Sequence, residues 1–501
     1  MSSRQFPAAS PPLPPPSTAG LQKLIMRPEK ARLVDIMLLL LLRMPVTSSY
    51  LHRDLDNMPG DLLVALTQLI QKALAAAYYP VKWFGAIVEF LLNFVAVNGG
   101  LLGVIWSIMR CNIVIRLNRE APNFRTVMAL VDDRTELKRS PGAAVSDMGR
   151  LWTKNGKCTE AALLPITFEV TVMAAKIAYE NAAYIENVVA NVWKFNFVGY
   201  YSCWNKFLKV NATQAFVMTD RGKDADMVMV AFRGTQMFST QDWSTDVNLS
   251  WLRLGGMGNV RAGFLKALGL QEEDGEDAAR AFPRDAPAAV TAGKVVAYYE
   301  LRKVLRELLR EHPRARVVIT GHSLGGALAV LFPAVLALHG ERDILGRLGA
   351  VHTYGQPRVG DAAFVGFFRA KVAADYTRVV YRYDMVPRVP FDAPPVARFS
   401  HGGTCVYYDG WNVGRVLDGG EEVPNPNYVN PRHALSVYGG AMGDLLKAML
   451  LWVKTGGEYR EGAVSMLYRA AVGMLVPGIA SHSPRDYVNA IRLGRIGTAA
   501  G

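Results

Sequence analysis

The sequence predicts an α/β fold with a mostly parallel central sheet and helices on its faces. Two observations support this prediction. Short β-rich runs alternate with helical runs through the second half of the chain, which is the pattern of strands joined by crossover helices. One apolar strand, Val317–Thr320, also leads through a glycine turn directly into a helix that begins at Leu324.

The individual elements follow from the spacing of the apolar residues, with a period of two in strands and about 3.6 in helices. Strands are expected at Thr213–Thr219, Met227–Phe232, Val317–Thr320, Val351–Tyr354 and Arg378–Tyr383. Helices are expected at Phe168–Trp193, Pro287–His312, Leu324–His339 and Asp361–Lys371.

The composition limits the function classes. The chain has 501 residues, too many for one ordinary core, and a formal net charge of +13. No long Lys/Arg run and no nucleic-acid-binding module accompanies this charge, so we expect no nucleic-acid partner. A basic protein also adsorbs to anionic lipid surfaces. Four widely spaced cysteines without a CxxC pair favour a reducing, cytosol-facing environment: Cys111, Cys158, Cys203 and Cys405.

Three parts are expected along the chain. Residues 1–25 include the proline-rich run Pro11–Pro16 and cannot form a core, so they are predicted to be disordered. Residues 26–160 form an N-terminal helical region, in which Ile36–Leu42 is too short to cross a membrane. Residues 161–501 form the globular α/β domain, with an acidic insertion loop near 272–277.

One apolar segment, Trp83–Met109, is long enough to cross the ~30 Å hydrocarbon layer of a bilayer as a helix. Its only charge is Glu89, and basic residues flank it. Its polar and glycine residues suit a bent element in one leaflet equally well: Asn93, Asn98, Gly99 and Gly100. A membrane span, an element lying in the lipid surface and a buried core helix all remain open.

Ser323 is the predicted nucleophile. It lies in the sequence Gly321-His322-Ser323-Leu324-Gly325, and that pentapeptide alone is a weak signal. Its setting between a buried-type strand and a helix is what a nucleophile elbow of the α/β-hydrolase fold requires. The turn lifts the Ser323 hydroxyl to the carboxyl edge of the sheet and points the Leu324 backbone N–H at the developing oxyanion.

A serine nucleophile needs a base, and the base needs an acid that orients it. Asp384 follows a predicted strand and precedes a proline-bounded loop, whereas Asp361 reads as a helix N-cap. Three histidines follow Asp384 in the chain, and sequence order alone leaves all three open as the base: His401, His433 and His482.

The loop after the strand that ends at Phe232 predicts the remaining parts of the site. Thr235 follows Arg233-Gly234 and offers a second N–H to the oxyanion. Apolar residues among polar ones come next and suit a lid with one apolar face: Met237, Phe238 and Trp243. Ordinary core packing is the alternative for these three side chains.

Four motifs together resemble the class 3 lipase family: residues 230–235, 320–329, 354–360 and 383–390. The C-terminal run that begins at His482, like the apolar N-terminal region, is similar to the plant oil-body triacylglycerol lipases. The resemblance implies His482 as the base and Thr235 as an oxyanion residue. His482 also lies in a loop between prolines, whereas His433 directly precedes a helical run. Relatives often carry a histidine where this chain has Arg261, outside the triad.

The resemblance implies a triacylglycerol lipase at the surface of lipid droplets, which cleaves acyl esters through an acyl-enzyme and needs no metal or cofactor. Its expected partners are acylglycerols and the droplet or membrane surface, and the sequence carries no signal for an oligomeric state. One alternative is a phospholipase or galactolipase A1 that acts on polar membrane lipids. Another is a non-catalytic droplet-coat protein.

Overall fold

The computed structural model describes residues 23–26, 36, 51–53, 61–138, 166–206, 208–236, 238–240, 243, 250–272, 278–286, 294–390, 399–417, 438–440, 442–443, 445–447, 450, 462–475 and 477–496. Several predictions fall outside these residues: most of the proline-rich start, most of Ile36–Leu42 and of the acidic loop, Met237 and His433.

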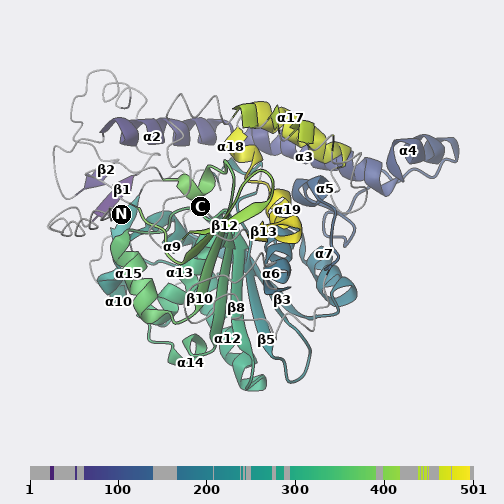
Figure 1. Cartoon of the computed structure of the whole chain (residues 1–501). Helices are drawn as coiled ribbons and strands as arrows, with labels where there is room; N and C mark the ends of the chain where they lie inside the picture. The colour runs from purple at the N-terminus through teal and green to yellow at the C-terminus, as the bar shows by residue number, and fades with distance from the viewer. Residues whose placement is uncertain are drawn as a thin grey trace, which may run out of the picture.

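A nine-stranded sheet forms the centre of the molecule, in the order β13-β12-β11-β10-β9-β8-β5-β4-β3 (Figure 1). The five neighbouring strands from β5 to β11 are parallel, and antiparallel strands flank them. The predicted α/β-hydrolase architecture is therefore confirmed. The strands are β3 (Asn196–Asn205), β4 (Val210–Thr219), β5 (Met227–Phe232), β8 (Arg316–His322), β9 (Leu348–Tyr354), β10 (Asp375–Tyr381), β11 (Thr404–Tyr408), β12 (Val413–Leu417) and β13 (Arg495–Ile496).

Helices cover both faces of this sheet, so its parallel strands are apolar on both sides. In β8, Val317 and Ile319 pack into the core on one face and Val318 into the core on the other. The first core lies under α9 (Ala262–Leu268), α12 (Ala297–Glu311), α13 (Leu324–Leu338) and α15 (Ala362–Lys371). The second lies under α6 (Ile166–Ile177), α7 (Ala182–Glu186), the π-helix η2 (Asn187–Val192) and α19 (Pro484–Leu493).

The helix expected over Phe168–Trp193 is divided into three of these elements, because Asn181 ends the first run and caps α7 by accepting the Tyr184 N–H. The shorter elements are α10 (Ala278–Ala281), α14 (Arg342–Leu345) and the 3-10 turns η3 (Gly255–Met257) and η4 (Val386–Arg388).

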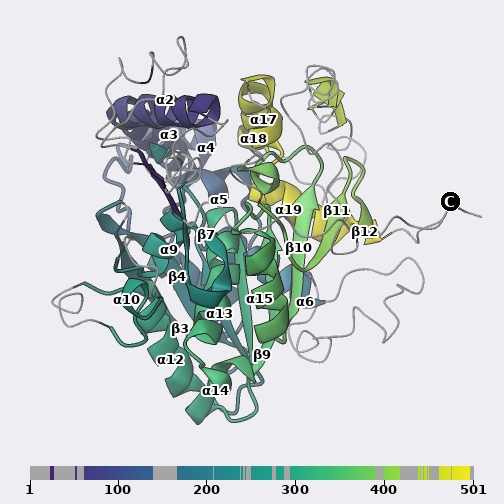
Figure 2. The same ribbon diagram turned by 90° about the vertical axis from the view of Figure 1, so that its left-hand side faces the viewer.

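A layer of helices lies across one end of the sheet (Figures 1 and 2). It contains α2 (Asp61–Ala76), α3 (Tyr78–Val97), α17 (Ala463–Leu475) and α18 (Pro477–Ala480), with α4 (Gly100–Met109) and α5 (Val127–Val131) at its side. In Figure 1, α14 lies at the opposite end and leads directly into β9. The carboxyl ends of the parallel strands therefore face the helical layer.

A second, four-stranded antiparallel sheet joins the N-terminus to the α/β domain. Its order is β2 (Leu51–Arg53), β1 (Lys23–Met26), β6 (Trp251–Arg253) and β7 (Asn259–Arg261). Leu24 pairs with Trp251, more than two hundred residues away in the chain. The expected boundary between residues 25 and 26 thus falls inside a strand, and residues 26–160 are not purely helical.

The apolar segment Trp83–Met109 consists of two helices rather than one. α3 ends at Val97, and α4 begins at Gly100 after a bend in which Gly99 and Gly100 both have φ of 84°. Among the described residues, α3 is the one helix long and apolar enough to cross a membrane by length and composition, which is weak evidence by itself.

Candidate active site

The elbow at Ser323 has the geometry that its motif predicts. Ser323 lies between β8 and α13 with φ of 58° and ψ of −131°, a backbone conformation that non-glycine residues rarely adopt. Its N–H donates to the carbonyl of Tyr354 over 2.9 Å. A Cβ on Gly325 would lie 2.3 Å from the carbonyl oxygen of Phe232, so only glycine fits beside β5. The elbow is thus held against both neighbouring strands.

Asp384 and His482 form a buried pair. Nδ1 of His482 lies 2.7 Å from Oδ2 of Asp384, and Asp384 has no solvent exposure. The Val386 N–H donates to the other carboxylate oxygen over 2.8 Å. The second ring nitrogen of His482, Nε2, is buried and has no hydrogen-bond partner among the described residues. An imidazole ring held in this way keeps Nδ1 hydrogen-bonded to the carboxylate and leaves Nε2 able to accept a proton.

Gly355 brings this pair to the nucleophile. It follows Tyr354, whose carbonyl accepts the Ser323 N–H, and it has φ of 58°. A Cβ at this position would lie 2.8 Å from Oδ2 of Asp384 and 2.8 Å from Cε1 of His482. The acid and the base therefore pack directly on the segment whose Tyr354 carbonyl also accepts the Ser323 N–H.

Two residues that sequence reasoning did not assign also support the pair. The ring of His322 lies against that of His482, with centroids 4.4 Å apart and an interplanar angle of 31°. The Tyr179 hydroxyl lies 2.8 Å from Nδ1 of His322. Burial lowers the pKa of His322 well below its usual value, and the neighbouring His482 lowers it further. His322 is therefore a neutral neighbour that does not oppose a positive charge on His482.

Tyr487 is the second such residue. It lies on α19, fully buried, and its hydroxyl hydrogen-bonds to Oδ2 of Asp384. Its position five residues after His482 is visible in the sequence, but that spacing is shared by Tyr438 and His433 and so could not identify the contact.

The predicted oxyanion residues lie on the two elements that meet at the elbow. Leu324 is the first residue of α13, directly after Ser323. Thr235 is buried in the turn after β5, and β5 pairs with β8 up to the register Phe232–Gly321. A Cβ on Gly234 would lie 2.5 Å from the His322 carbonyl oxygen, so this turn packs against the elbow.

The two competing candidates that the structure describes, Asp361 and His401, have other partners. The Asp361 side chain accepts the Phe364 N–H over 2.9 Å and caps α15, as its sequence context predicts. His401 lies 2.6 Å from the Pro387 carbonyl through Nε2, and the described residues show no hydrogen bond between it and Asp384. Arg261, where the family resemblance leads us to expect histidine, is buried and packs its guanidinium over the Phe264 ring at 4.5 Å.

The site is closed from solvent. Ser323 is 3% exposed and His482 is 7% exposed. Phe238, three residues after Thr235, contacts the first turns of α3. Its ring meets the ring of Phe84 edge to face with centroids 5.9 Å apart, and a Cβ on Gly85 would lie 2.5 Å from its Cβ. The predicted lid residue Phe238 therefore joins the apolar helix to the loop that carries Thr235, whereas Trp243 is half-buried.

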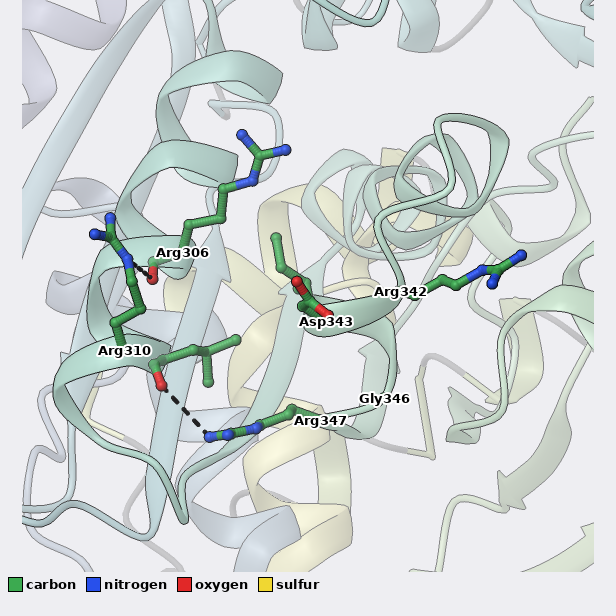
Figure 3. Close-up of a pocket in the computed structure, with 8 residues that line it drawn as sticks. Arg306, Arg310, Arg342, Asp343, Gly346 and Arg347 are labelled. Carbon is green, nitrogen blue, oxygen red and sulfur yellow. Dashed lines mark hydrogen bonds between the residues drawn. The ribbon is translucent and has the colours of Figure 1, made fainter.

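A hollow of about 670 Å³ between α12 and α14 is a different feature (Figure 3). None of the predicted site residues lines it, and it lies at the opposite end of the molecule from the helical layer. Four arginines line it, but Arg306 is paired with Glu341 at 2.6 Å. Figure 3 shows the Arg342 guanidinium pointing away from those of Arg306 and Arg310. The basic groups do not converge on one point as an anion site would require.

The chain is similar to known lipases. Residues 229–393 match the model of the family described as "Lipase (class 3)". A protein of Nicotiana tabacum named "Triacylglycerol lipase OBL1" is 35% identical over 488 residues, covering 86% of this chain and 83% of its own. Its namesake in Arabidopsis thaliana is 34% identical, with coverage of 86% and 85%. A solved triacylglyceride lipase of Rhizomucor miehei is 23% identical with a TM-score of 0.33, over 48% of this chain and 78% of its own.

The parallel sheet, the strained serine elbow and the buried Asp–His pair define a serine hydrolase of the α/β-hydrolase type. The long matches to its relatives make the assignment narrower: the chain belongs to the class 3 lipase family.

Proposed function

We propose that this lipase hydrolyses triacylglycerol at the surface of lipid droplets, with Ser323, His482 and Asp384 as its catalytic triad. The observation that carries the chemistry is the buried Asp384–His482 pair, whose free Nε2 belongs to a ring packed on the backbone that binds Ser323. The relatives' names and the apolar helical layer over the site support the substrate and the location.

The reaction begins when the Ser323 hydroxyl oxygen attacks the ester carbonyl carbon and Nε2 of His482 takes the hydroxyl proton. Asp384 stabilises the imidazolium that forms. The proton then passes to the leaving oxygen, so that diacylglycerol departs and an acyl-enzyme remains. Water, deprotonated by the same nitrogen, attacks the acyl carbon and releases the fatty acid.

The negative charge on the carbonyl oxygen needs hydrogen-bond donors placed before the reaction. The proposed donors are two backbone N–H groups. That of Leu324 lies at the start of α13, and that of Thr235 lies in the turn that packs against the elbow. Both belong to backbone held by the sheet, so little reorganisation is needed when the charge develops. Loss of one such donor typically costs about two to three powers of ten in kcat.

A cytosol-facing location is part of the proposal. Cys111, Cys203 and Cys405 are unpaired thiols, which is common for proteins in a reducing environment. The droplet surface is a phospholipid monolayer over neutral lipid. An apolar helical layer next to the active site suits such a surface, because substrate can reach Ser323 without crossing water.

A fluorophosphonate probe and a substrate panel together test this proposal. The probe should label wild-type protein and leave Ser323→Ala unlabelled, while the variant still folds. Emulsified triacylglycerol should then be hydrolysed faster than phospholipid or galactolipid vesicles. Labelling that persists in Ser323→Ala would show a different nucleophile. Preference for the polar lipids would instead make the enzyme an A1-type phospholipase or galactolipase.

A further inference from the structure

Three polar side chains of α3 and its C-terminal cap face the protein: Glu89, Asn93 and Asn98. Asn93 is buried and exchanges two hydrogen bonds with the backbone of Arg125, at 2.8 and 3.0 Å. Asn98 does the same with Val114, at 3.0 and 2.9 Å. The Glu89 carboxylate accepts the Val127 N–H at 3.4 Å. These bonds join one side of α3 to the chain that returns after α4.

The opposite side of α3 and most of α4 are apolar and exposed. Leu102 is 82% exposed, which is extreme for a leucine. We call this surface the α3–α4 face; its main members are Trp83, Ile87, Leu91, Leu101, Leu102 and Ile105. So large a patch of exposed apolar side chains marks an interaction surface.

A second exposed apolar strip comes from the other end of the chain. Tyr438, Met442, Leu446 and Leu450 recur every four residues and are all exposed, which makes a strip along one side of the helical turns there. Leu467 on α17 is 69% exposed as well. We call these five residues the C-terminal strip.

Both surfaces lie at the same end of the molecule. Figure 1 shows α17 beside α3. In Figure 2, α2, α3 and α17 stand in a row, and the yellow-green helical turns that include residues 445–447 continue it. The carboxyl ends of the parallel strands face this row.

We infer that the lipid-binding surface of this enzyme is built from both ends of its chain, the α3–α4 face and the C-terminal strip, and that α3 lies flat on the lipid instead of crossing a bilayer. The inference rests on the proposed action at a lipid surface and identifies the residues that make the contact.

The hydrogen bonds of α3 argue against a span. A spanning α3 would carry Asn93 and Asn98 into hydrocarbon. Either Arg125 and Val114 would follow them there, or both amides would lose their backbone partners. A helix lying in the surface keeps every one of these bonds, and the bend at Gly99–Gly100 lets α4 follow the same plane.

The chemistry at the edge of the surface fits phospholipid headgroups rather than a protein partner. Lys82 lies 5.3 Å from the centre of the Tyr78 ring, and Arg110 lies 4.4 Å from that of Trp106. Aromatic rings beside basic groups at the ends of apolar helices are typical of the membrane interface. The net charge of +13 attracts anionic lipid.

Single glutamate substitutions in the full chain test the composite surface by flotation with phospholipid-coated triolein emulsions. Leu450→Glu and Leu467→Glu should each lower the bound fraction at least several-fold, as Ile87→Glu should. Val192→Glu is the matched control, because Val192 is exposed but lies in η2, away from the layer. All four variants should hydrolyse a soluble short-chain ester at the wild-type rate.

The outcomes separate the inference from the proposed function. Normal flotation of Leu450→Glu and Leu467→Glu, with loss in Ile87→Glu alone, would restrict the surface to the N-terminal helices and overturn the inference. Normal flotation of all three would contradict droplet binding through this end of the molecule. A lipid-free wild-type dimer that Leu450→Glu converts to a monomer, with flotation unchanged, would make the strip a protein interface.

Thiol labelling tests whether α3 lies flat. Cys111 is exposed and lies two residues after the end of α4, whereas Cys203 and Cys405 are buried. In a Cys158→Ser background bound to intact vesicles, a charged maleimide should label Cys111 without detergent. Labelling only after detergent would mean that α3 carries Cys111 across the bilayer, and the flat orientation would be wrong.

Discussion

Tyr487 donates its hydroxyl hydrogen to the same oxygen of Asp384 that Nδ1 of His482 contacts. Burial and the neighbouring Asp384 raise the pKa of Tyr487 well above its usual value, so the tyrosine remains a donor throughout the working range. Together with the Val386 N–H, these contacts hold the carboxylate in one orientation. Tyr487 is therefore a positioning residue for the acid of the proposed triad.

Tyr487→Phe should lower kcat/KM about ten- to a hundredfold, because the carboxylate that orients His482 loses a donor and a hydrogen bond to a charged group is worth about 1.5–3 kcal/mol. Without this donor, the carboxylate concentrates more negative charge and stabilises the His482 imidazolium more strongly. The acid limb of the pH–rate profile should therefore move to higher pH. Tyr408→Phe is the control, because Tyr408 is also a buried tyrosine but has no contact with Asp384 among the described hydrogen bonds. A fall in rate without a shifted limb would indicate a purely structural role.

Gly355→Ala should reduce activity at least a hundredfold. The new methyl group would lie within 3 Å of both Asp384 and His482, and φ of 58° is strained for alanine. Displacement of a catalytic group by about 1 Å is enough for a loss of that size. Gly366→Ala is the control, since a Cβ there meets nothing within 4 Å in α15. Steady-state kinetics and thermal unfolding check both variants. Near-normal turnover of Gly355→Ala would contradict the close packing of Gly355 against Asp384 and His482.

Glu180 should make stability depend on pH. Burial raises the pKa of Glu180 to about 7 from 4.5, although hydrogen bonds from Thr126 lower it. Below about pH 4.5 the folded and unfolded states are both protonated. As the pH rises to about 7, the unfolded chain releases this proton first, so folding loses up to about 3 kcal/mol.

Glu180→Gln imitates the protonated form. The amide NH2 group can still donate to the Thr126 hydroxyl, and the amide oxygen can accept a hydrogen bond from the Thr126 backbone N–H. The free energy of unfolding, measured by denaturant titration, should be higher than that of wild type at pH 8 and similar at pH 4.5. Parallel pH profiles for the two proteins would mean that Glu180 titrates normally.

Phe238→Ala should loosen the cover over the active site. The substitution removes the ring that meets Phe84 and the surface that packs on Gly85. Hydrolysis of a soluble short-chain ester should rise severalfold, and the ratio of emulsion to soluble activity should fall. Phe84→Ala removes the same contact from the other side, so the double variant should add little to either single one. Additive effects would show that the two rings act independently.

The catalytic elbow could be predicted because it is local. Val317–Thr320, the glycines and the helix formers after Ser323 are contiguous, so their pattern already contains the turn. The choice of His482 needed the family resemblance, because its contact with Asp384 joins residues 98 positions apart. Tyr487 and His322 were missed for the same reason, since a buried aromatic residue reads as core until its partner is known.

The N-terminal sheet could not be predicted from local patterns. β1, β2, β6 and β7 have three or four residues each, too few for a period of two to be distinguished from chance. Their stability comes from pairing between distant segments. The C-terminal strip was not predicted either. Four of its residues, Tyr438, Met442, Leu446 and Leu450, have helical spacing in the sequence, but only burial separates an exposed strip from a core-facing one.

In the proposed flat binding of α3 to a lipid surface, the inward hydrogen bonds of Asn93 and Asn98 would also determine how the enzyme leaves a droplet. Since neither amide takes a partner from the lipid, release only re-wets the outer side of α3, and no backbone has to refold. Attachment of this kind would be a reversible equilibrium governed by the surface that a droplet offers. As hydrolysis shrinks the droplet, that surface would decline and enzyme molecules would return to the surrounding water. Consumption of the substrate thus limits the number of enzyme molecules that remain at work on it.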